Sequence, residues 1–161
     1  MPAFGELRAS VTRAIQRGVR LDVGHGTASL SFAVAKRAIS LGILPHTISS
    51  DIYCRNRING PVYSLANVMS KFLAIGMSLP QVIDCVTANA ADGLNLKTKG
   101  RLQPGLDADL TLFTLQRQPT LLVDAENDSL QAEKLLVPLA AVRAGKGYMT
   151  EQGSAQHAFD F

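Results

Sequence analysis

The chain has 161 residues, of which 47% are hydrophobic and 18% are charged, and its formal net charge is +3. This length suits one domain with a core of its own, and this composition excludes an intrinsically disordered chain. No apolar run reaches the roughly 18 residues that a membrane span requires, so we expect no membrane partner.

The basic residues do not form the dense run, interleaved with aromatic side chains, that is typical of nucleic-acid-binding modules, and the chain has no Trp. We therefore expect no nucleic-acid partner. Residues 1–6 have neither a basic nor an apolar region of the kind that opens a secretory signal. Cys54 and Cys85 lie far apart and fit reduced thiols better than a disulfide framework, which predicts a cytoplasmic protein.

The first 93 residues alternate between helical and strand patterns with short connections. That alternation predicts parallel βα units and an α/β fold. The expected elements are, in order, a helix over 6–17, a strand over 19–23, a helix over 32–41, a strand over 47–52, and helices over 61–76, 79–86 and 87–93. Ser78 and Gln81 have the spacing of a capping box at the start of the helix over 79–86.

After residue 93 the pattern changes to β structure. Short strands are expected over 110–115, 121–123 and 135–137, with a final hairpin whose turn covers 144–147. Pro138 lacks an N–H, which places it at a sheet edge or a bulge. We therefore divide the chain into a βα part over 1–93, a small β region over 94–150 and a loose polar tail over 151–161.

The first two expected strands end in residues that can carry chemistry. The first strand runs into Gly24-His25-Gly26 and the second into Asp51. If these strands are parallel neighbours, both side chains lie at the same C-terminal rim, where α/β enzymes place their active sites. Such a pair could be a general base with its orienting group, or part of a metal site. The alternatives are a locally bonded loop histidine and a surface or helix-capping aspartate.

The other two histidines give weaker indications of a functional role. His46 precedes its strand, so we expect it at the opposite rim with a structural role, and His157 in the tail carries no signal. The segment from Asp51 to Pro61 is expected to be a loop over the site. Its residues Asn56, Arg57 and Asn59 could contact an anionic or amide-bearing substrate, and we assign Asn56 and Gly60 of this segment to substrate binding.

A catalytic zinc ion takes three protein ligands, and this chain offers His25 and Asp51 at the expected rim, with no H-x-H pair. The sequence also lacks a phosphate loop, a dinucleotide-binding fingerprint, H-E-x-x-H and G-x-S-x-G. We therefore do not expect one copy of these residues to assemble a complete hydrolytic metal centre.

Four stretches, taken together and in order, resemble the amidohydrolase superfamily, in particular its dihydroorotase-like deacetylases. They are residues 21–26 (LDVGHG), 47–51 (TISSD), 69–73 (MSKFL) and 99–110 (KGRLQPGLDADL). The resemblance implies the last two βα units of a (β/α)8 barrel of the TIM type, followed by strands of a small β-sandwich domain. It also implies a hydrolase that uses zinc or another divalent metal and acts on an amide, cyclic amide or ester through a metal-activated water.

In that family the aspartate that Asp51 matches ligates the metal and serves as the general base, and His25 matches a substrate-binding or supporting histidine. The other metal ligands of the family have no counterpart in this chain, and Tyr53 and Ala90 depart from its pattern. We therefore expect a segment that is inactive alone, binds metal weakly or not at all, and either forms a homo-oligomer or needs an N-terminal half. The alternative is a non-catalytic module for association or small-molecule binding.

Overall fold

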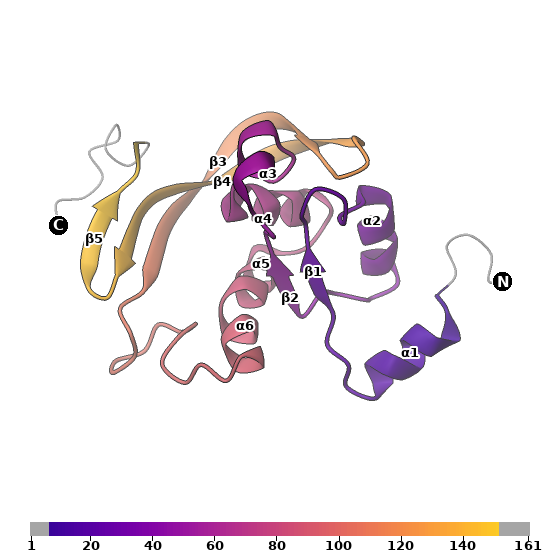
Figure 1. Cartoon of the computed structure of the whole chain (residues 1–161), viewed down its shortest axis with the longest axis horizontal. Coiled ribbons are helices and arrows are strands. Elements are labelled where there is room, and N and C mark those ends of the chain that lie inside the picture. The colour runs from indigo at the N-terminus through magenta and orange to yellow at the C-terminus, as the bar shows by residue number, and fades with distance from the viewer. Residues whose placement is uncertain (1–6, 152–161) are drawn as a thin grey trace.

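A computed structural model of the chain describes residues 7–151 and shows a group of helices around two short strands, with a long β-hairpin arched over them (Figure 1). No helix in this described range is long and apolar enough to cross a lipid bilayer. The helices are α1 (Ala9–Gln16), α2 (Phe32–Ser40), α3 (Cys54–Asn59), α4 (Leu65–Ala74), α5 (Leu79–Val86) and α6 (Ala88–Gly93). The strands are β1 (Asp22–Gly24), β2 (Thr47–Ser49), β3 (Leu110–Val123), β4 (Ser129–Arg143) and β5 (Lys146–Met149).

The strands β1 and β2 are parallel neighbours, with Val23 opposite Ile48, which confirms the predicted βα arrangement. Ile48 is buried in the core, and Val23 packs against that core from the same side of the sheet. On the other face the Asp22 carboxylate accepts hydrogen bonds from Thr47 Oγ1 at 2.6 Å and Ser49 Oγ at 3.4 Å. Alternation along both strands therefore separates an apolar, helix-covered face from a polar one.

The predicted capping box at α5 is confirmed, because Ser78 N donates to Gln81 Oε1 at 2.8 Å and Gln81 N donates to Ser78 Oγ at 3.4 Å. The helix expected to open at Pro61 is α4, which instead begins at Leu65. Its start is fixed by Ser64, whose Oγ accepts a hydrogen bond from Asn67 N at 3.1 Å. Our prediction of the first residue of this helix was wrong because the Ser64 cap defines the start.

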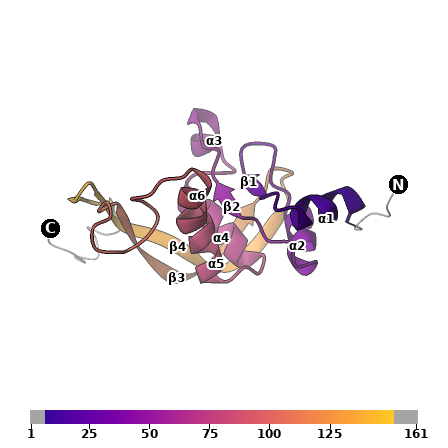
Figure 2. The ribbon, with the colours of Figure 1, turned by 90° about the horizontal axis from the view of Figure 1, so that it is seen from below.

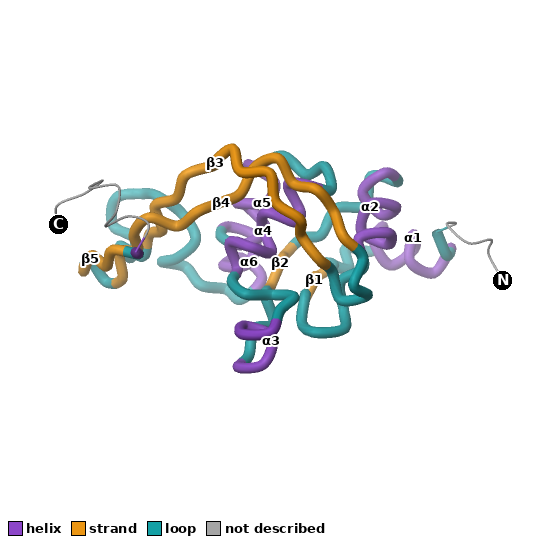
Figure 3. The backbone as a smooth tube through the Cα atoms, turned by 90° about the horizontal axis from the view of Figure 1, so that it is seen from above, coloured by secondary structure: helices purple, strands orange, loops and turns teal. Residues whose placement is uncertain are grey.

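The segment that we expected to be a loop contains the short helix α3. Asn56 stabilises the start of this helix, since its Oδ1 accepts a hydrogen bond from the backbone N–H of Tyr53 at 2.8 Å. Six residues without an apolar stripe carry no helical periodicity, so α3 could not be predicted from the sequence pattern. The views from below and above show α3 projecting from the body on the side opposite β3 and β4 (Figures 2 and 3).

The short strands expected after residue 93 are parts of two long ones. β3 and β4 pair antiparallel along nearly their whole length, and β5 pairs with β4 to give a three-stranded sheet. The polar residues that separate the apolar runs of β3 stay in the strand because their backbone groups pair across the ladder, as at Gln116 and Leu135. A register shift between Leu112 and Phe113 places Pro138 next to a bulge, as predicted. A sandwich of two sheets is not confirmed within this described range.

The hairpin packs on α4, and the two share one hydrophobic core. Leu122 and Leu136 of the hairpin belong to the same buried cluster as Val68 and Phe72 of α4. Beside them Leu136 N donates a hydrogen bond to Ser70 Oγ at 3.0 Å. The division at residue 93 stays a prediction. Residues 1–6 and 152–161, which include most of the expected tail and His157, lie outside the described part of the chain.

Candidate functional site

The two parallel strands bring the candidate residues to one rim. Beyond β1 and β2 the ladder continues, because His25 N donates to Ser49 O and Gly26 N donates to Ser50 O, both at 3.2 Å. The loop of Gly24, His25 and Gly26 is thereby held beside the backbone that leads into Asp51. The first two expected site residues, His25 and Asp51, therefore come from adjacent strand ends.

The Asp51 carboxylate lies directly against the glycines of this loop. A Cβ atom placed on Gly26 would lie 3.1 Å from Asp51 Oδ2, and one placed on Gly24 would lie 3.6 Å from it. Asp51 itself is exposed and has a φ of 52°, an angle that non-glycine residues seldom adopt. The glycines therefore leave room for a carboxylate that faces solvent at the rim.

His25 is completely buried beneath the rim. Its Nδ1 lies 2.9 Å from the carbonyl oxygen of Gly26, and its Nε2 lies 2.7 Å from Lys71 Nζ. Because a carbonyl oxygen can only accept, Nδ1 carries the proton and Nε2 accepts from the lysine. Burial, together with the positive charge of Lys71, lowers the pKa of His25 below its usual value.

Both ring nitrogens of His25 are therefore engaged away from Asp51, and the pair of a base with its orienting group that the sequence left open is not formed in this structure. A histidine whose two nitrogens are both bonded within the protein is also a poor metal ligand. Its assignment to substrate binding stays a prediction.

Lys71, on α4, is a residue that the sequence analysis did not single out. Its side chain is almost fully buried, and besides His25 its Nζ donates to the carbonyl oxygen of Pro61 at 2.6 Å. Burial lowers its pKa to about 8, an effect that the negative charge of Asp124 opposes. A signal for it was present, because Lys71 lies three residues after Val68 and four before Ile75, on the apolar face of the helix.

Asn56 is buried, and its side-chain amide is used to shape the segment after Asp51. Its Nδ2 donates to the carbonyl oxygen of Asp51 at 3.0 Å while its Oδ1 accepts from Tyr53 N. Its own carbonyl accepts from Tyr63 N at 3.3 Å, which closes the segment at its far end. These contacts support a role in positioning Asp51, and a contact of Asn56 with substrate stays a prediction.

Gly60 ends α3 with a φ of 78° and a ψ of −178°, a combination that belongs almost solely to glycine. A Cβ atom there would lie 2.5 Å from Tyr63 Oη. The structure thus gives Gly60 a conformational reason for its place, and its assignment to substrate binding stays a prediction. Arg57 and Asn59 of the same segment are exposed.

Tyr53 joins the two loops of the rim on their solvent side. Its hydroxyl lies 2.9 Å from Thr27 Oγ1, which follows the glycine loop directly.

At the other end of β2, His46 N donates to Leu21 O at 2.8 Å, and its carbonyl accepts from Asn89 Nδ2 at 2.9 Å. His46 therefore lies at the opposite rim, as expected, among backbone contacts.

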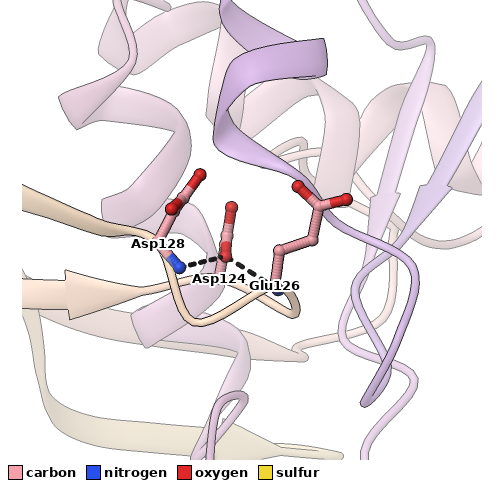
Figure 4. Close-up of side chains that lie close together, drawn as sticks. All are labelled: Asp124, Glu126 and Asp128. Carbon is pink, nitrogen blue, oxygen red and sulfur yellow. Dashed lines mark hydrogen bonds between the residues drawn. The ribbon is translucent and has the colours of Figure 1, made fainter.

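Within residues 7–151, three carboxylates lie close enough together to hold a metal ion: Asp124, Glu126 and Asp128, in the turn between β3 and β4 (Figure 4). Asp124 is buried, and its oxygens accept from the backbone N–H groups of Phe32, Glu126 and Asp128 at 2.7–2.9 Å. Glu126 accepts from Ser31 Oγ at 2.7 Å. The lone pairs of Asp124 are thus used to hold the turn and α2, and this arrangement accounts for the cluster without a metal.

At the rim, the described residues offer the carboxylate of Asp51 and a histidine with both nitrogens engaged. A metal centre with three protein ligands does not fit this set. The carboxylate can exchange protons with a bound molecule, and the amide groups can orient such a molecule by hydrogen bonding. The described part of the chain does not complete a metal centre.

Comparison with known proteins shows the family to which this chain belongs. Residues 5–143 match the amidohydrolase family, and the chain belongs to that family.

A deacetylase of Enterococcus faecalis is 41% identical over 146 residues, which cover 91% of this chain and 40% of that protein. Two crystal structures are also similar. An adenine deaminase has a TM-score of 0.88 at 39% identity, covering 90% of this chain and 39% of its own. A dihydroorotase has a TM-score of 0.79 at 36% identity, covering 89% and 38%. The chain thus spans about two-fifths of the length of these relatives.

Proposed function

We propose that this chain forms the C-terminal part of an amidohydrolase barrel and supplies the carboxylate that exchanges protons during hydrolysis. The observation that carries the proposal is the placement of Asp51, which lies exposed at the shared rim of two parallel strands and against the glycines of the neighbouring loop. In barrel enzymes this rim holds the active site. A carboxylate there can take a proton from an attacking water and return it to a leaving group.

The architecture that we propose is the last two βα units of a (β/α)8 barrel over residues 1–93 and the strands of a small sandwich domain over 94–150. The parallel pair of β1 and β2 supports the first part, and the antiparallel sheet of β3, β4 and β5 supports the second. The polar face of the short sheet, with Asp22, Thr47 and Ser49, would then face the inside of the barrel.

The substrate class that we propose is a small molecule with an amide, cyclic amide or ester bond. The names of the similar proteins, a deacetylase and a dihydroorotase, support this class. Members of the amidohydrolase family generally bind a divalent metal, and zinc or another divalent ion is the cofactor that we propose for the intact enzyme. Since the described residues do not complete a metal centre, we assign to this chain the proton transfer by Asp51 and expect no activity from the chain alone.

Asp51 can be tested in a chimera in which the matched region of the Enterococcus faecalis deacetylase is replaced by this chain. We expect the chimera to retain deacetylase activity and the Asp51→Asn variant to lose about 100- to 10,000-fold in kcat, the usual contribution of a general acid–base group. The control is Asp84→Asn, which changes an exposed carboxylate of α5. An Asp51→Asn chimera as active as its parent would contradict the assigned role.

The oligomeric state gives a second test, because among residues 7–151 the strands β1 and β2 form a two-stranded sheet in which each has an unpaired edge. Unpaired parallel edges favour association with other strands. We therefore expect the purified chain to be a homo-oligomer, or to require an N-terminal partner to stay in solution. Light scattering that shows a stable monomer would contradict this expectation.

The second candidate function is a non-catalytic module for association or small-molecule binding. The observation that favours it is that the described residues provide a single exposed carboxylate at the rim, without a metal centre. Metal analysis and turnover of the purified chain separate the two candidates from a complete enzyme. Stoichiometric zinc together with hydrolysis of N-acetyl amino acids or dihydroorotate would contradict both, because it would show a complete site formed by this chain.

A further inference from the structure

Lys71 connects the two loops that form the rim. From α4 its ammonium group donates to His25 Nε2 in the glycine loop and to the carbonyl oxygen of Pro61, at the end of the segment after Asp51. Lys71 and His25 are each at most 1% exposed, so water does not compete for these bonds. A buried ammonium group is costly unless its hydrogen bonds are satisfied, and two of its three donors are satisfied here.

The contacts continue from Lys71 to the carboxylate at the rim. The His25 ring donates to the carbonyl of Gly26, and the N–H of Gly26 donates to Ser50 O, the residue before Asp51. The side chain of Asp51 lies against Gly26. The position of the lysine therefore fixes the position of the histidine, and through the backbone of Gly26 the histidine fixes the surface on which Asp51 lies.

The charges around Lys71 agree with this arrangement. His25 faces the ammonium as a neutral acceptor, because burial and the charge of Lys71 both lower the pKa of the imidazole. The buried carboxylate of Asp124 favours the charged forms of both Lys71 and His25. The donor Lys71 Nζ at Nε2 and the acceptor Gly26 O at Nδ1 together stabilise a single tautomer of His25.

We propose that Lys71 is a positioning residue for the Asp51 site, which joins the two rim loops and holds His25 as the tautomer with its proton on Nδ1. Its bearing on catalysis rests on the proposed function, whereas the structural part of the inference does not. Lys71 does not touch the exposed face of the rim, so it acts through His25 and Pro61.

The direct test is nitrogen NMR of the histidine rings in the purified chain near neutral pH. In the wild-type protein we expect His25 to show a protonated Nδ1 and an unprotonated Nε2. In Lys71→Met, which has a similar length but no donor, we expect the Nε2 signal of His25 to shift because that atom loses its hydrogen bond, and the pKa of His25 to rise because the positive charge is gone. The control is Lys36→Met, which removes an exposed lysine of α2 and should leave the His25 signals unchanged.

A second measurement follows the rim itself. Amide hydrogen exchange at Gly26 and Tyr63 should become about tenfold faster or more in Lys71→Met, because two charge-assisted hydrogen bonds that hold these loops are lost. Exchange in β4 and β5 should change less than this.

Unchanged His25 signals in a folded Lys71→Met protein would overturn the inference. A wild-type His25 with its proton on Nε2 would overturn it as well, and that measurement does not depend on the variant folding. Neither readout requires turnover. A chimera in which Asp51→Asn has no effect would overturn the proposed function and leave the tautomer result as it is.

Discussion

Replacement of Asp124 by alanine is expected to lower the free energy of unfolding by about 3 kcal/mol, because it leaves one buried and two partly buried backbone donors without an acceptor. The carboxylate is 1% exposed and accepts from the N–H groups of Phe32, Glu126 and Asp128. Phe32 opens α2, whose N-cap residue Ser31 makes no side-chain capping bond. Asp124 thus caps α2 from a turn 92 residues away, where a negative charge also interacts favourably with the start of the helix.

The measurement is urea unfolding followed by circular dichroism. Asp124→Asn keeps the shape and one acceptor oxygen, so we expect a loss between that of the alanine variant and the wild type. The matched control is Asp128→Ala in the same turn, an exposed carboxylate whose loss should cost less than about 0.5 kcal/mol. A control as damaging as Asp124→Ala would show that the turn, and not the capping of α2, is what matters.

The second large effect is a rise in stability at alkaline pH that depends on Lys71. Its pKa is lowered from 10.5 to about 8 in the folded protein, so between these values the unfolded chain binds more protons than the folded one. Stability must therefore rise as the pH increases through this window. The penalty for the buried charge is fully present below about pH 8, and its removal is worth roughly 3 kcal/mol by about pH 10.5.

The check is the difference in pH dependence between the wild type and Lys71→Met. Groups such as Cys85 and Lys99 titrate in both proteins and largely cancel in this difference, so the remaining slope reports Lys71. Parallel stability curves between about pH 8 and pH 10 would show that Lys71 is not held as a buried cation. Below pH 6.5 the lowered pKa of His25 contributes a loss of stability, because the unfolded chain then binds more protons than the folded one.

The parts of the fold that could be predicted are those with a strong local signal. The helical patterns of residues 6–17 and 32–41 predicted α1 and α2, and the capping box predicted the start of α5. The alternation of strands and helices predicted the parallel pair of β1 and β2. The helix α3 was missed because it is short and is held by a single asparagine side chain. The length of β3 and β4 was missed because cross-strand pairing, which local sequence does not encode, carries polar residues through the strand.

The residues of the candidate site likewise divide into those with a local sequence signal and those that depend on long-range contacts. Asp51 and His25 could be found because each follows a β-prone run, and strand ends are a local feature of the sequence. Lys71 and Asp124 depend on contacts 46 and 92 residues apart, with His25 and Phe32, and no spacing rule reports such distances. A charged residue on an apolar helix face, as at Lys71, is the one signal that reasoning from the sequence could have used.

Ser70 and Lys71 are consecutive on α4, yet one bonds to the backbone of β4 and the other to the loops of the rim. A rotation or slide of this helix would break both attachments at once. The helix α4 is therefore held rigidly between the sheet and the rim. Any opening needed to admit a reactant must then come from bending of the connecting segments, such as the one that carries α3, while the helix stays in register.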